Sequence, residues 1–527
     1  MENKFRFKIK AFVAVGAILL AVVSCAKDEQ EMQYSSTMQS KVAPVNETDM
    51  ITLGSLINDP YNYENMLAAL DQLKQEDVEL PFESIEPTGV YVKVLPQDDD
   101  ALDALEADTS IIWLDYPLHY EVSGGCYYHD NSVSDSNLTW LYGVVPIGYK
   151  FPAGVTVATI YDVFIPEDDD ETYDLLEDKS LEMTENIKVN LMPTDEIQKT
   201  TANKFTPSAT IQAYDDTLKA FLPLQGVKVV AKLGVKTKKG FTNSNGVCVV
   251  NGKFKKPVNY SVKWESEYWD IRGKRGQAYT TGPKMQGQWN LKIYPGGQDI
   301  MFATIHCAAY KFFYGDHLGI KRPYLNVGKL KIKYHHESWP VIGVYRFDWN
   351  IFGLRPNIDI WGYDNNSESY RSDEIFGSVI HCLGYISHKN YLGNNKFQQT
   401  NQFIVESWVS CIECALTDHY YKVDHTLTTQ YKCSNGFQYW IPTGTIFDCF
   451  TPVFIDLMDS YNQYYNVYYH FIKDEISGYT LREIQDSIIS EARDLASLRT
   501  VLKKRKMHGA TDAQIDTLLA KYEGLNF

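Results

Sequence analysis

The sequence predicts a multidomain α+β protein, with small α/β units, an all-β sandwich and a mainly α-helical C-terminal domain. The chain has 527 residues, enough for about three or four domains of roughly 100–200 residues. Strand-like alternation dominates the middle of the chain, and the 3.6-residue period of helices dominates after residue 300. Hydrophobic residues make up 44% and charged residues 22%, which is typical of globular proteins.

The charge balance restricts the class of partner. The formal net charge is −17, and no basic stripe runs along the sequence. An acidic body repels phosphate backbones, so we expect no nucleic-acid partner. The chain is rich in Tyr (37) and Trp (10), which suits surfaces that stack on sugars or on partner proteins.

Residues 1–24 have the composition of a secretory signal peptide. A basic start is followed by an apolar run of about 13 residues, shorter than the roughly 20 that a membrane-spanning helix needs. The run ends in Val22-Val23-Ser24-Cys25, which resembles a bacterial lipobox. The resemblance implies that Cys25 is lipidated and becomes the mature N-terminus. The alternative is a plain signal peptide with a chance cysteine.

Residues 25–48 are polar and read as a flexible tether. Their start, Ala26-Lys27-Asp28-Glu29, resembles the surface-export signal of Bacteroidota lipoproteins. That resemblance implies a lipid-anchored protein of the outer membrane that faces the cell surface, with the membrane as a partner through the N-terminal anchor. The alternative is an ordinary solvated tether.

Residues 49–190 are expected to form two small α/β units. We expect helices at 63–73 and 101–106, and strands at 89–95 and 111–114. Leu95-Pro-Gln-Asp-Asp-Asp is similar to Ile165-Pro-Glu-Asp-Asp-Asp, which suggests a duplication. Acidic triplets of this kind are expected to satisfy free amides at helix N-termini, with calcium ligation as the alternative.

Residues 190–212 read as a linker, and residues 213–295 as an all-β domain with strands at 226–231, 247–250 and 258–264. A strand opened by the segment from Pro223 to Val227 and a turn from Thr242 to Gly246 resemble the carboxypeptidase-regulatory-like β-sandwich. The resemblance implies a module that holds or presents something and carries no chemistry.

Residues 300–527 are expected to be mainly helical. The pattern predicts helices at 302–313, 373–389, 403–420, 481–505 and 513–522, and strands at 329–334 and 357–361. Thr480-x-x-Glu483 and Thr511-x-x-Gln514 are capping boxes that open the last two helices.

One helix carries the pattern with the most chemical content. His381-Cys382-Leu383-Gly384-Tyr385-Ile386-Ser387-His388 resembles the active-site helix of HExxH zinc peptidases, in which two His at i and i+4 bind the ion and the Glu is the base. Cys382 stands at the base position and Tyr385 at the second His. Glu406, 25 residues after His381, resembles the third ligand of gluzincin-type enzymes, with Glu413 as the alternative.

Three interpretations of this helix remain open: a non-catalytic peptidase-like domain, an ordinary buried helix, and an atypical metalloenzyme. His381 and His388 are about 10.5 Å apart along a helix, too far for one tetrahedral ion. His381 and Glu406 are the candidate zinc ligands, with Tyr385 beside them. Cys382 and His381 point about 100° apart, which argues against a cysteine nucleophile.

The cysteines are expected to be buried thiols or to form one disulfide. Cys411-x-x-Cys414, Cys433 and Cys449 have a spacing too irregular for the common zinc ribbons.

The sequence therefore predicts an envelope-anchored lipoprotein, non-catalytic and with a binding or structural role, built on a metallopeptidase-like domain. No cofactor is expected, and the ligand is a protein or a glycan. The alternatives are a divergent zinc metallopeptidase, with zinc as its cofactor, and a glycan-binding surface lipoprotein.

Overall fold

The computed structural model describes residues 49–134, 138–185, 203–323, 328–339, 341–345, 357–428, 451–460, 475–520 and 522. The expected signal peptide, the lipidation site Cys25 and the tether up to residue 48 lie outside the described residues, as do Cys433 and Cys449. The described chain is a multidomain α+β protein with several sheets and a helical C-terminal region, as expected. Within it, no helix has the length and apolar character that crossing a membrane requires.

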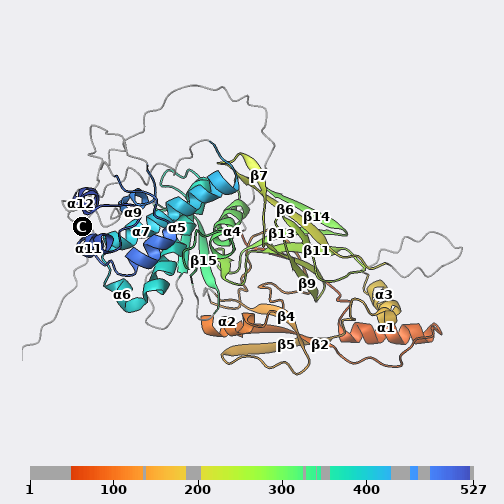
Figure 1. Cartoon of the computed structure of the whole chain (residues 1–527). Helices are drawn as coiled ribbons and strands as arrows, with labels where there is room; N and C mark the ends of the chain where they lie inside the picture. Colours follow the sequence, from red (N-terminus) through yellow and green to blue (C-terminus); the bar gives the residue numbers. More distant parts are fainter. Residues whose placement is uncertain are drawn as a thin grey trace, which may run out of the picture. The chain divides into compact units, whose positions relative to one another are not determined.

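The N-terminal part combines two antiparallel sheets with short helices (Figure 1). Its strands are β1 (Thr52–Leu56), β2 (Gly89–Pro96), β3 (Tyr120–Ser123), β4 (Leu141–Pro146) and β5 (Val155–Val163). Its helices are α1 (Tyr63–Gln75), α2 (Asp99–Glu106), α3 (Asp174–Met183) and the short 3₁₀ turn η1 (Glu171–Tyr173). Strand β1 pairs with β3, and the second sheet has the order β4-β2-β5.

The suggested duplication corresponds to β2 with α2 and β5 with α3, and the two strands pair with each other in one sheet. The acidic triplets act as helix caps. The side chain of Asp98 accepts a hydrogen bond from the Ala101 amide at 2.8 Å, and Asp170 accepts one from the Thr172 amide at 2.9 Å. Both bonds satisfy amides that the first turn of a helix leaves free.

The middle of the chain is a β-sandwich that begins earlier than expected. Its two sheets are β10-β6-β14, with β7 on β6, and β13-β11-β8-β9. The strands are β6 (Ser208–Asp215), β7 (Ala220–Pro223), β8 (Lys228–Leu233), β9 (Lys236–Phe241), β10 (Val247–Val249), β11 (Val258–Lys263), β13 (Tyr279–Met285) and β14 (Gln288–Ile293). The end of the expected linker 190–212 is therefore part of β6, whose alternate residues are buried.

A third, mixed sheet and a group of helices follow. The sheet order is β12-β15-β17-β16, from β12 (Trp269–Arg272), β15 (Leu330–Ser338), β16 (Gly343–Tyr345) and β17 (Asn357–Tyr363). The helices are α4 (Gln298–Tyr314), α5 (Ser372–Leu392), α6 (Asn394–Gln398), α7 (Gln402–Asp418), the π-helical turn η2 (His419–Asp424), α9 (Val453–Asp456), α10 (Leu481–Glu483), the π-helical turn η3 (Ile484–Ile489), α11 (Leu495–Lys504) and α12 (Asp512–Ala520). Helix α4 contacts both this sheet and the sandwich.

Gly226 shows how closely α4 approaches the sandwich. Its φ of +77° lies in the left-handed region, and a Cβ there would collide with the ring of Tyr310 on α4. The turn needs glycine because of this positive φ and because of the close approach of Tyr310. Gly226 belongs to the segment from Pro223 to Val227 that resembles the carboxypeptidase-regulatory-like sandwich.

Two predicted elements are wrong. Residues 111–114 form no strand; only Leu114 makes an isolated bridge, to Tyr142. The helix expected over 481–505 is interrupted, because the π-helical turn after α10 ends near Ser490 and Asp494 caps the start of α11 by accepting from the Ser497 amide at 2.7 Å. The two predicted capping boxes at Thr480 and Thr511 are both present.

Candidate functional site

The predicted site lies between two packed helices. Helix α5 lies beside α4 and α7 (Figure 1). It also contacts the sheet strands β16 and β17. Its apolar stripe is buried, as predicted: Ile375, Phe376, Val379, Ile380, Leu383 and Ile386 are each at most 2% exposed. His381 and Tyr385, one turn apart on α5, meet Glu413 and Glu406, two turns apart on α7. We call these four side chains, with Gln402, the His381 cluster.

His381 is held by a carboxylate on each side of its ring. Nδ1 lies 2.8 Å from Oε2 of Glu413, and Nε2 lies 3.6 Å from Oε2 of Glu406. The side chains are 24% exposed for His381, 21% for Glu406 and 13% for Glu413. Gly377, one turn before His381, lies so close to Oε1 of Glu413 that a Cβ there would come within 2.8 Å.

This arrangement favours the charged form of the imidazole. Burial alone would lower the pKa of His381, but the hydrogen bonds and negative charges of Glu406 and Glu413 outweigh it and raise that pKa to about 10. His381 is therefore an imidazolium at neutral pH, with both N–H groups directed at carboxylates. A metal ligand, in contrast, must be a neutral imidazole with a free lone pair.

Tyr385 and Gln402 form hydrogen bonds to Glu406. The hydroxyl of Tyr385 and the side-chain amide of Gln402 both donate to Oε1 of Glu406. Tyr345 of β16 stacks on Tyr385, with ring centroids 5.9 Å apart. The phenol that replaces the second histidine of the motif therefore acts as a hydrogen-bond donor to the carboxylate.

Cys382 does not join the cluster. It is 1% exposed, and its sulfur lies beside Gly343 of β16, where a Cβ on the glycine would come within 3.2 Å of it. Burial raises the pKa of the Cys382 thiol far above its usual value. The residue at the base position therefore faces the sheet and is a neutral thiol.

His388 is also separate from the cluster. It is fully buried against the ring of Phe397, and within the described residues neither ring nitrogen has a hydrogen-bond partner. Burial, and secondarily the charge of Arg493, lower its pKa to about 3. His388 is a neutral core residue.

The donor set of the His381 cluster does not fit a hydrolytic zinc centre. Over the described part of the chain, no group of three His, Cys, Asp or Glu side chains is arranged to hold a metal ion. His381, Glu406 and Glu413 are familiar types of zinc ligand, but both carboxylates pair with the ring nitrogens of His381, and the phenol of Tyr385 donates to Glu406. We therefore derive no reaction step that passes through a metal.

Sequence reasoning found Glu406 and treated Glu413 as its substitute, whereas both contact His381 at once. The spacing of seven residues between them, two turns on one helix face, was the available signal. Gln402, four residues before Glu406, was missed. The described cysteines Cys126, Cys248, Cys307, Cys382, Cys411 and Cys414 are free thiols.

Comparison of the chain with family models, with curated proteins and with solved structures finds no match.

Proposed function

We propose that this chain is an envelope-anchored lipoprotein with a non-catalytic binding or structural role, built on a metallopeptidase-like domain. Anchoring at the outer membrane, facing the cell surface, is supported by the lipobox-like segment that ends in Cys25 and by the acidic start of the tether. The lack of a catalytic role is supported above all by one observation. Both ring nitrogens of His381 pair with carboxylates, Nδ1 with Glu413 and Nε2 with Glu406.

The physical argument is a competition between a proton and a metal ion. A raised pKa means that the cluster binds a proton tightly, and zinc must displace that proton before Nε2 can coordinate. Cys382 faces the sheet, so no acceptor stands at the motif's base position to take a proton from a bound water. The cluster then serves to connect α5 to α7.

A divergent zinc metallopeptidase is the second candidate, and one contact favours it. A histidine that binds zinc through one nitrogen usually donates its other N–H to a carboxylate. Glu413 stands in that position at 2.8 Å from Nδ1.

Metal analysis of the purified protein separates the two candidates. We expect no stoichiometric zinc after dialysis against micromolar zinc and no zinc-dependent peptide hydrolysis. About one tightly held zinc per chain, lost in a His381→Ala variant, would instead establish the metalloenzyme.

A gain-of-function variant tests the peptidase-like origin of the domain. Tyr385→His places an imidazole one turn from His381 and next to Glu406, which restores the three ligands of a gluzincin site, two histidines and one glutamate. We expect this variant to acquire about one zinc per chain. Tyr391→His, on the same helix but hydrogen-bonded to Asp486, is the matched control and should acquire none. If the Tyr385 variant folds and binds no zinc, α5 resembles the peptidase helix by chance.

A further inference from the structure

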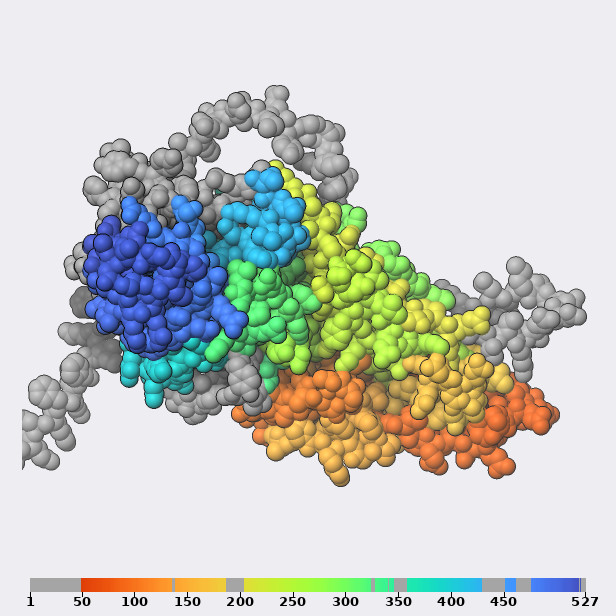
Figure 2. Space-filling view, in the orientation of Figure 1, coloured from red at the N-terminus to blue at the C-terminus, as the bar shows by residue number. Residues whose placement is uncertain are grey.

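A cavity lined by several charged residues lies between α2 and the sandwich, far in the sequence from the His381 cluster. Its volume is about 600 Å³, within the range of small-molecule sites. Figure 2 shows the orange segment around residue 100 next to green parts of the chain, and both α2 and the sandwich strands β8, β9 and β11 contribute lining residues. Its lining includes the apolar residues Ile111, Trp113 and Phe241 and four lysines, Lys228, Lys239, Lys263 and Lys329. The ammonium group of Lys228 lies 5.8 Å from the centre of the Phe241 ring.

Three of these lysines already share a carboxylate. Glu265 is 2% exposed and pairs with Lys228, with Lys263 at 3.2 Å and with Lys329 at 2.8 Å. Lys329 also pairs with Glu106 at 3.1 Å. Burial alone would raise the pKa of Glu265, but the lysines outweigh it and hold that pKa well below its usual value.

Lys239 differs from the other three. Its ammonium group donates to the main-chain carbonyl of Thr109, and among the described residues no ion pair joins it to a carboxylate. The charged groups that act on it most are Lys228, Glu265, Lys263 and Lys329, which are three cations and one anion. Two further acids line the cavity, Asp103 on α2 and the exposed Glu267. Burial and the neighbouring cations lower the pKa of Lys239 to about 8, so an added negative charge beside it would be stabilising.

The apolar lining offers a complementary surface. Phe241 of β9 is 52% exposed, so its ring is open to contact by a ligand. Trp113 is 3% exposed, and its ring packs in a small apolar core with Leu102 and against Gly143 of β4. Its main-chain carbonyl accepts a hydrogen bond from Lys263 at 3.1 Å.

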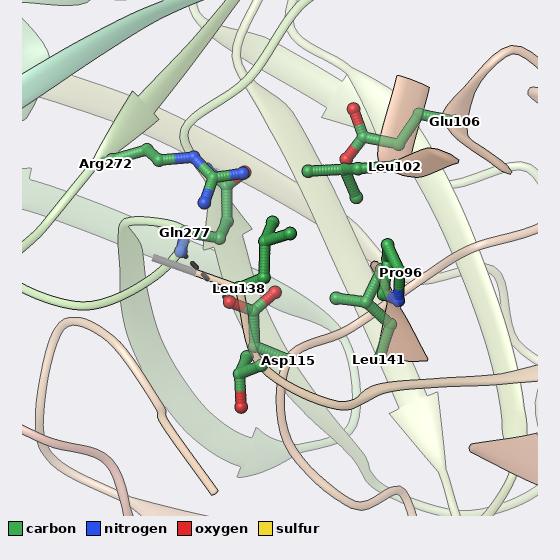
Figure 3. A pocket seen from close by; sticks show the side chains of 9 residues that line it. Pro96, Leu102, Glu106, Asp115, Leu138, Leu141, Arg272 and Gln277 are labelled. Atoms are coloured by element: carbon green, nitrogen blue, oxygen red, sulfur yellow. Dashed lines mark hydrogen bonds between the residues drawn. The ribbon is translucent and has the colours of Figure 1, made fainter. Parts of the chain in front are cut away.

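In a neighbouring cavity, polar lining residues are hydrogen-bonded to each other (Figure 3). This cavity shares Glu106 with the larger cavity but holds only about 10 Å³, room for about one water. Asp115 there accepts from the Gln277 amide at 3.0 Å, and Arg272 pairs with Asp270 at 2.9 Å. That cavity is too small for an organic ligand.

We propose that the larger cavity binds an organic anion, whose carboxylate pairs with Lys239 and whose ring or aliphatic face lies against Phe241. The proposal supplies a ligand class for the binding role proposed above, and it does not depend on the His381 cluster.

Calorimetric titration of the full chain in EDTA tests it with two matched pairs of probes, glucuronate against glucose and benzoate against benzyl alcohol. We expect at least one anion to bind with a millimolar or tighter Kd, and its neutral counterpart to bind at least about tenfold more weakly. Lys239→Met should weaken the anion about tenfold or more. Lys238→Met is the matched control, because Lys238 is the adjacent residue on β9 and pairs with Asp168 at 2.8 Å; it should leave the affinity unchanged.

A second readout needs no variant. Because the free Lys239 is partly deprotonated at pH 8.5, a bound anion should raise its pKa and take up protons. Titrations in Hepes and in Tris should therefore give different heats at pH 8.5 and equal heats at pH 6. The proposal is overturned if neither anion binds at 10 mM, if the neutral probes bind equally well, or if binding at pH 8.5 takes up no proton. Because EDTA removes free zinc, these outcomes are independent of those that would refute the non-catalytic role.

Discussion

Replacing His381 by glutamine should destabilise the protein in a pH-dependent way. The pKa of His381 rises from 6.5 in the unfolded chain to about 10 in the folded protein, through Glu406 and Glu413 acting against burial. A group with a raised pKa contributes stability that is fully present below its unfolded pKa and is lost as the pH rises through its folded pKa. The contribution of His381 should therefore be complete below about pH 6.5 and absent above about pH 10.

The magnitude follows from the same shift. At about 1.4 kcal/mol per pKa unit, the upper limit is about 5 kcal/mol below pH 6.5 and about 3 kcal/mol at pH 8. Side chains that are 24% and 21% exposed are partly screened by water, so we expect about half of each value. His381→Gln should thus cost about 2–3 kcal/mol at pH 6, about 1–2 kcal/mol at pH 8 and little at pH 10.5.

Urea unfolding of wild type and His381→Gln at these three pH values, followed by circular dichroism, measures the loss. The control is His508→Gln, which removes another His–Glu pair, at 3.1 Å from Glu483, but one 36% exposed on the histidine side. That variant should lose less than about 0.5 kcal/mol at every pH. An equal loss for His381→Gln at pH 6 and pH 10.5 would refute the reasoning.

Three further outcomes are expected from the same region. His388→Leu should make the protein more resistant to acid. The pKa of His388 is lowered to about 3, so wild type loses stability as the pH falls below 6.5. In urea unfolding, the drop in free energy of unfolding from pH 7 to pH 5 should be about 2 kcal/mol smaller in the variant than in wild type. Tyr385→Phe removes a donor to Glu406 and should cost about 1–3 kcal/mol at pH 7, and a value near zero would show that the phenol is not bonded there. Cys382 should resist alkylation in the native protein and react only in urea, as mass spectrometry of its peptide would report; labelling at the rate of a free thiol would contradict its burial.

The fold class and the helix that carries the candidate site were predictable, because local periodicity encodes them. The stripe from Ile375 to Ile386 marks the buried face of α5 without any knowledge of its partners. The break before Asp494 was missed although Asp494-x-x-Ser497 is itself a capping signal, because the apolar spacing continues across it. A continuous apolar spacing over residues 481–505 therefore predicts one helix even where a capping residue, Asp494, begins a second one.

The assembly of the site was less predictable, because it depends on which helix faces meet. His381, Tyr385 and Glu406 were expected together, but the simultaneous approach of Glu413 to the other ring nitrogen requires the packing of α5 on α7. The lysine cavity was missed altogether. Its signal was a lysine at the end of a strand, as in Lys228 of β8 and Lys263 of β11, which by itself is typical of exposed strand ends.

The most direct test of the account is the protonation state of His381, read from the ¹⁵N chemical shifts of its imidazole at pH 8 before and after addition of one equivalent of zinc. The account predicts two protonated ring nitrogens that zinc leaves unchanged. A neutral imidazole in the free protein, or an Nε2 resonance that moves to a metal-bound position with one zinc, would contradict it.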